Sequence, residues 1–226
     1  MPSAADILRG LSVIANQGTG VAVAWHVLVA VALVALARGW RPSERAARLL
    51  IGMPLASVAA IAIAFDNPFN GLVFAVSAVV MTALAIIGGR RTVSLASHWT
   101  AGIGVALIAF GWVYPHFLEG PAIAYLYASP VGLVPCPTLA LVIGFALLGN
   151  GLGSRVWGVA LAAVGLFYGL FGVLRLAVFL DLALVGGAMA LIAAEFRSVK
   201  EGGVSPGATR RRSTAHGART PWQARA

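Results

Sequence analysis

The chain has 226 residues, of which 60% are hydrophobic and only 10% are charged, and its mean hydropathy is +0.91. A soluble domain of this length needs more charged surface to stay in solution, so the composition excludes one. The net charge of +9 lies in loops and in a tail, which makes the lipid bilayer and its anionic cytoplasmic leaflet the expected partners and excludes nucleic acid.

Seven apolar runs are predicted as transmembrane helices, each of which needs about 20 residues. Their expected bounds are 19–37, 49–65, 69–88, 99–114, 131–149, 156–174 and 177–196. The runs do not alternate between polar and apolar residues, so they predict an all-α, polytopic transmembrane helix bundle and exclude a β-barrel. Residues 1–17 are expected to form a short interfacial helix, residues 18–197 the transmembrane domain, and residues 198–226 a disordered basic C-terminal tail.

The positive charges predict the orientation of this bundle. With seven spans, every Lys and Arg except Arg9 and Arg175 falls on one side of the membrane. The positive-inside rule then places the N-terminus outside and the C-terminus in the cytoplasm, in the inner or plasma membrane of the cell. A six-span arrangement, in which the fourth run or one of the last two does not cross, stays open but spoils this sorting.

Polar residues other than Lys and Arg gather on the predicted outer side. Asn67 suits the cap of the third span and Pro68 its first turn, while Asn67 and Asn70 are also ligand candidates. The loop 115–130 carries His116, and its tyrosines are typical of the membrane interface.

The turn between the last two spans carries Arg175 and Asp181. An acid is costly in lipid, so Asp181 is expected to face the bundle or to pair with Arg175, either to fix packing or to bind a substrate. In the sixth span Gly165, Gly169 and Gly172 form a stripe of small residues, which predicts close helix packing.

The fifth run contains the motif Pro-Cys-Pro-Thr at residues 135–138. Two prolines inside an apolar run are expected to break the helix, and broken helices often mark transporter binding sites. The lone Cys136 excludes an intrachain disulfide, and with His26 and His116 it is a candidate ligand for a soft metal ion. Burial as a small hydrophobe is the alternative for this cysteine. Thr138 is a further site candidate.

Several motifs resemble a family of small bacterial multi-pass membrane proteins, catalogued only as a domain of unknown function. They are Asn16, Trp25, Asn67-Pro68, Tyr114-Pro115, the Pro-Cys-Pro-Thr motif at 135–138 and the stretch from Gly172 to Asp181. The resemblance covers about residues 16–195 and implies a fold and a motif position, without an activity. A second Thr often follows the motif in that family, whereas Leu139 stands here.

These observations favour a small permease or channel-like protein for an ion or small solute. Its site in the outer half of the bundle is expected to use Asn67, Asn70, His116, Cys136, Thr138, Arg175 and Asp181. A metal- or haem-binding membrane protein and a non-catalytic subunit that anchors a protein partner are the alternatives, and an enzyme is less expected. No cofactor is expected unless haem or a soft metal ion binds. The only lysine, Lys200, lies in the tail, which excludes a retinal Schiff base inside a span.

Overall fold

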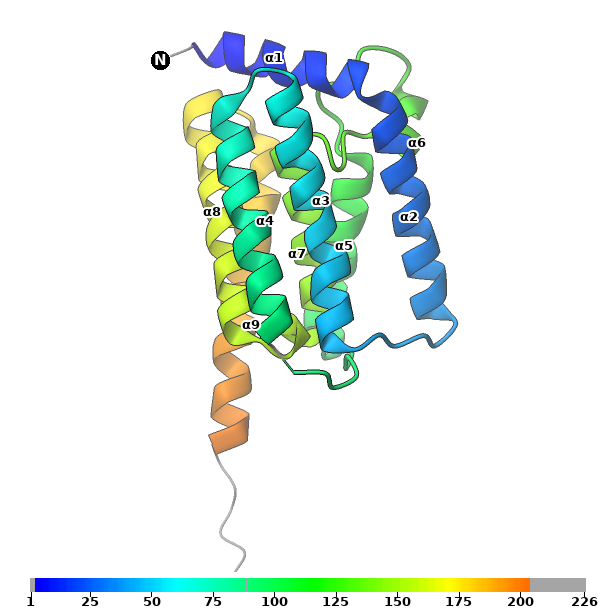
Figure 1. The fold of residues 1–226 in the computed structure, drawn as a ribbon, viewed down its shortest axis with the longest axis vertical. Helices are drawn as coiled ribbons and strands as arrows, with labels where there is room; N and C mark the ends of the chain where they lie inside the picture. Colours follow the sequence, from blue (N-terminus) through cyan, green and yellow to red (C-terminus); the bar gives the residue numbers. More distant parts are fainter. Residues whose placement is uncertain (1–2, 88, 204–226) are drawn as a thin grey trace, which may run out of the picture.

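A computed structural model describes residues 3–87 and 89–203, and within these ranges the chain is helical without any β-strand (Figure 1). The α-helices are α1 (Ala4–Gln17), α2 (Thr19–Ala37), α3 (Glu44–Ala64), α4 (Pro68–Ile87), α5 (His98–Val113), α6 (Tyr125–Ala128), α7 (Pro135–Leu148), α8 (Arg155–Leu176) and α9 (Leu182–Gly203). Short 3-10 turns form η1 (Ala122–Ala124), η2 (Asn150–Gly153) and η3 (Phe179–Asp181).

Five of the described helical segments are long and apolar enough to cross a membrane by length and composition. They are α2, α3, α4, α8 and the segment Phe179–Arg197 of η3 and α9. The helices α5 and α7 are also apolar but shorter, with 16 and 14 residues. The predicted all-helical membrane bundle is therefore confirmed, whereas seven spans and their orientation stay predictions.

Local sequence signals explain where several helices begin. Ser3 caps α1 through a capping box with Asp6, and Ser43 caps α3 by accepting a hydrogen bond from the Ala46 N–H. Asn67 Oδ1 accepts a hydrogen bond from the Asn70 N–H at 3.2 Å, next to Pro68 in the first turn of α4. The predicted capping roles of Asn67 and Pro68 are confirmed.

The helix α7 forms the centre of the bundle and is buried along almost its whole length (Figure 1). It packs against α3, α5, α8 and α9. Its approach to α5 is close because a Cβ atom on Gly144 would lie 2.7 Å from the Gly104 carbonyl oxygen, and the reverse holds for Gly104. These facing glycines let the two short helices touch backbone to backbone.

The Pro-Cys-Pro-Thr motif starts a helix in the structure. Pro135 is the first residue of α7, and Pro137 lies in the first turn, where a helix needs no N–H donor. The prediction of a broken helix at this motif is wrong for that reason. Residues 131–134, which the sequence assigned to the fifth span, are buried and non-helical.

The two ends of the bundle differ in their covering. At one end α1 lies across the helices, and Asn16 holds it there by donating to the Phe117 carbonyl at 2.9 Å and accepting from the Glu119 N–H at 2.9 Å (Figure 1). At the opposite end the interhelical loops carry arginines, and α9 continues to Gly203, past the predicted start of the tail at residue 198. The rest of the predicted tail lies outside the described residues. We call these ends the α1 end and the arginine end.

Candidate functional site

A cavity of about 510 Å³ lies under α1 at the α1 end of the bundle. Its wall combines residues of α1, of the turn between α3 and α4, of α7, of α8 and of η3. The lining includes five of the seven predicted substrate or ion residues, namely Asn67, Asn70, Cys136, Arg175 and Asp181. The topology thus brings together side chains that lie more than a hundred residues apart in the sequence.

Asp181 is the most buried charged residue of this cavity, with 1% of its surface exposed. Its two carboxylate oxygens have different donors. The Tyr114 hydroxyl donates to Oδ1 at 2.7 Å, and the Cys136 thiol donates to Oδ2 at 3.2 Å. Because a buried carboxylate without partners is costly, these two donors explain how the acid is accommodated at this depth.

The position of Asp181 depends on a glycine of the neighbouring helix. A Cβ atom on Gly172 would overlap Asp181 Oδ2, the oxygen that accepts from Cys136. One helical turn earlier, a Cβ on Gly169 would lie 2.8 Å from Val185 Cγ2, and one on Gly165 would meet Ile143 Cδ1. The predicted packing role of the glycine stripe is confirmed, and Gly172 in addition makes room for the carboxylate.

A second polar pair also lines the cavity. The Tyr168 hydroxyl of α8 donates to Asn70 Oδ1 of α4 at 3.0 Å, and both residues are buried. Phe74 packs against the Tyr168 ring with 5.1 Å between the ring centroids. Phe69 and Phe171 stack at 6.4 Å and line the cavity, so its polar groups are set in an aromatic wall.

The rim of the cavity carries both signs of charge. Arg175 is exposed at the end of α8, and Asp6 of α1 and Asp66 of the α3–α4 turn lie on the rim as well. The Ser3 hydroxyl and backbone N–H donate to Asp6, and these hydrogen bonds lower the pKa of its carboxyl. Asp6 is therefore ionised at neutral pH, and it faces the cavity entrance as an anion.

The structure places the other candidate residues elsewhere. Thr138 is fully buried, donates to the Val134 carbonyl at 2.7 Å and accepts from the Gly132 N–H at 2.8 Å. It thereby fixes the non-helical segment that leads into α7. His116 lies in a neighbouring cavity with Leu8, and its ring packs against Phe117 with 4.3 Å between centroids. Burial lowers the pKa of His116.

The three candidate metal ligands do not form one cluster. His26 lies on α2, where its two ring nitrogens face the carbonyl oxygens of Ala22 at 2.8 Å and Trp112 at 3.0 Å. Cys136 instead contacts Asp181, and His116 lines a different cavity. Across residues 3–87 and 89–203, no group of three His, Cys, Asp or Glu side chains is placed to hold a metal ion.

Two tyrosines belong to the site although the sequence did not single them out for it. In the sequence, Tyr114 stood out only as part of the Tyr114-Pro115 pair at the end of a predicted span. The signal for Tyr168 was its place in the middle of an apolar helix, where a phenol hydroxyl needs a buried partner. Both hydroxyls hydrogen-bond the polar residues that the sequence did identify.

Comparisons with protein-family models, with curated proteins and with solved structures match nothing to this chain. The resemblance carried by the Pro-Cys-Pro-Thr motif therefore stays a prediction. The apolar helices and their arrangement are those of an integral membrane protein, with a cavity at its α1 end that several polar side chains line.

Proposed function

We propose that the protein is a small permease for an ion or small solute that binds in the cavity under α1. The observation that carries this proposal is the Asp181 carboxylate, buried beside the cavity between the Tyr114 hydroxyl and the Cys136 thiol. An acid inside a membrane helix bundle is costly and commonly belongs to an ion or substrate pathway.

The cavity suits a small solute with a positive charge or a hydrogen-bond donor. Asp181 supplies a negative group, and the amides of Asn67 and Asn70 add polar contacts from another part of the lining. The aromatic wall formed by Phe69 and Phe171 favours a cation through its ring faces. A volume of about 510 Å³ lies within the usual range of small-molecule sites, roughly 300–1,000 Å³.

The α1 end is the predicted outer side, so the cavity is expected to take its solute from outside. The helix α1 covers the cavity through Ile7, Gly10 and Leu11, while Asp6 lies on the cavity rim and Arg9 is exposed. Movement of α1 gives the simplest route of entry, because the other walls belong to packed helices of the bundle.

Uptake into proteoliposomes tests this proposal with three labelled probes, namely rubidium ion, methylammonium and glycerol. At least one probe is expected to enter faster than in protein-free vesicles, and Asp181→Asn is expected to abolish that excess. Glu119→Gln is the matched control, because Glu119 is an exposed acid at the same end and does not line the cavity. Equal uptake by the two variants, or uptake of no probe above background, would overturn the proposal.

A further inference from the structure

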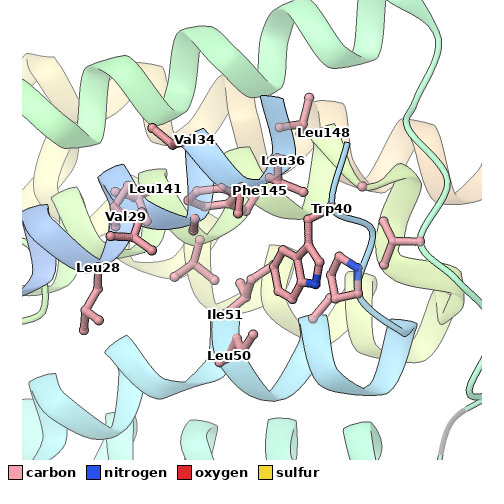
Figure 2. A pocket seen from close by; sticks show the side chains of 18 of the residues that line it. Leu28, Val29, Val34, Leu36, Trp40, Leu50, Ile51, Leu141, Phe145 and Leu148 are labelled. Atoms are coloured by element: carbon pink, nitrogen blue, oxygen red, sulfur yellow. The ribbon is translucent and has the colours of Figure 1, made fainter. Parts of the chain in front are cut away.

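A second cavity, of about 1000 Å³, forms a groove between α2 and the rest of the bundle. Figure 2 shows Leu28, Val29, Val34 and Leu36 of α2 on one side and Leu50 and Ile51 of α3 on another. Leu141 and Phe145 of α7 form the floor. The lining is apolar along the length of α2 and becomes charged only at Arg38.

The groove exists because α2 is hydrogen-bonded to the bundle near the α1 end and packs more loosely towards the arginine end. Near the α1 end, the Trp25 Nε1–H donates to Ser57 Oγ at 3.0 Å, and His26 Nε2 lies 3.0 Å from the Trp112 carbonyl oxygen. Towards the arginine end the contacts of α2 come from partly buried side chains such as Leu33 and Leu36. Only 17% of its apolar stretch is buried, whereas the other four candidate spans are 33–39% buried.

The arginine end of the groove suits an anionic head group. Arg38 lines the groove and is exposed, and Trp40 beside it is 47% exposed. Arg41 donates to the carbonyl oxygens of Leu36 at 2.7 Å and Trp40 at 2.8 Å, which fixes the end of α2. Tryptophan and arginine at this depth are typical of the level of lipid head groups.

The length of the groove matches one leaflet. From Leu28 to Arg38 the helical rise covers about 15 Å, which is about half of the hydrocarbon core of a bilayer. An acyl chain whose head group sits at Arg38 therefore reaches Leu28 within its own leaflet. A soluble apolar ligand would not need Arg38. A protein segment that is not helical would leave its backbone polar groups unpaired in the groove.

We propose that this groove binds one anionic phospholipid from the leaflet at the arginine end, with an acyl chain between α2 and α7 and the phosphate at Arg38. The lipid fills the space that α2 leaves and completes its packing. This proposal is independent of the transport function, since the groove and the cavity under α1 share no lining residue.

Native mass spectrometry of the full chain in mild detergent tests the proposal, with phosphatidylglycerol and phosphatidylcholine of identical acyl chains as probes. One phosphatidylglycerol is expected to stay bound under conditions that remove phosphatidylcholine. Arg38→Gln is expected to lower the affinity for phosphatidylglycerol roughly fivefold, since one arginine near the surface contributes about that much. Ala35→Trp, which fills the groove from α2, is expected to abolish binding.

Matched controls come from the same regions. Ala37→Trp adds the same bulk on α2 outside the groove, and Arg90→Gln removes a charge from the arginine end that does not line it. Both are expected to bind phosphatidylglycerol like the unchanged protein. Equal retention of the two lipids, equal losses in the controls, or a dimer that Ala35→Trp dissociates would overturn the proposal. Because Arg38 is exposed, its variant decides the question even if the tryptophan variant does not fold.

Discussion

The Asp181 carboxylate has room only because Gly172 lacks a side chain. The carboxylate oxygen that accepts from Cys136 occupies the space that a Cβ on Gly172 would fill. The thiol in turn is positioned by Pro135 and Pro137, which start α7 at this depth. Cys136 and Gly172 therefore both act on the Asp181 carboxylate, the first as a hydrogen-bond donor and the second by leaving room for it. Each role can be tested by a single substitution.

Gly172→Ala is expected to push the carboxylate away from Cys136 and to destabilise the protein by about 1–3 kcal/mol through overpacking. Thermal unfolding in detergent measures the stability, and the rate of Cys136 modification by N-ethylmaleimide measures the loss of its hydrogen bond. Gly186→Ala is the control, because nothing lies within 4 Å of a Cβ at that position. If both alanine variants unfold and react alike, the fit between Gly172 and Asp181 is not what positions the acid.

His116 is expected to make the stability of the α1 end depend on pH. Burial lowers its pKa in the folded protein, so between the folded and the unfolded pKa values the unfolded chain binds more protons. Stability should therefore fall as the pH drops from neutral through the unfolded pKa, about 6.5, and level off below the folded pKa. His116→Gln should remove this part of the pH dependence in thermal unfolding, whereas His98→Gln, at an exposed position, should keep it. An unchanged pH profile in His116→Gln would contradict the expectation.

Among the elements, α1 relates most directly to the cavity. It is amphipathic, buries Leu11 and Ile14 against the bundle, and carries Asp6 at the cavity rim and Arg9 at an exposed position. The capping box of Ser3 with Asp6 stabilises its first turn, and the hydrogen bonds of Asn16 attach its other end to the loop after α5. This amphipathic helix covers the cavity without being part of the transmembrane core.

Ser3→Ala should loosen the first turn of α1, since loss of an N-cap costs about 1 kcal/mol. The expected result is faster modification of Cys136 by N-ethylmaleimide, because the cavity under α1 opens more often. Ser12→Ala on the same helix provides the comparison, since the Ser12 carbonyl, not its hydroxyl, accepts from Asn16. A rate for Ser3→Ala that equals the Ser12→Ala rate would show that the cap does not control access.

At the scale of the whole molecule, the number of spans depends on whether α5 and α7 cross the membrane. The helices α5 and α7 are short, yet the chain on either side of each lies at opposite ends of the bundle (Figure 1). The prediction of seven crossings requires that both of these short helices cross. It also places Arg90 and Arg155 at the arginine end and Glu119 at the α1 end, so the crossing of both short helices can be tested.

Single cysteines introduced into a Cys136→Ala background test this arrangement with a membrane-impermeant maleimide applied to intact cells. Glu119→Cys should be labelled, whereas Arg90→Cys and Arg155→Cys should be labelled only after the cells are broken. All three positions are exposed, so access within the folded protein does not limit the reaction. Labelling of Glu119→Cys and Arg90→Cys from the same side would show that α5 does not cross.

Sequence reasoning found the helices and five of the polar residues that line the cavity, for physical reasons that also explain what it missed. Apolar runs and helix caps such as Asn67 depend on residues close in the sequence, so they can be predicted from it. The cost of an acid in lipid pointed to Asp181 in the same way, without knowledge of its contacts. Which donors reach that acid depends on the tertiary packing of α5, α7 and η3, so the role of Tyr114 was missed. The structural role of Thr138 was also not predictable, because its hydrogen-bond partners lie in a non-helical segment.

The central position of α7 has a consequence for how the protein is made. Its 14 residues rise only about 21 Å, less than the roughly 30 Å of the hydrocarbon core, and its partners α8 and α9 are synthesised after it. During synthesis the packing of α7 is therefore incomplete until α8 and α9 have been made. A chain cut after Leu148 would carry the cysteine of the site but would lack both the acid and the helices that keep α7 from lipid.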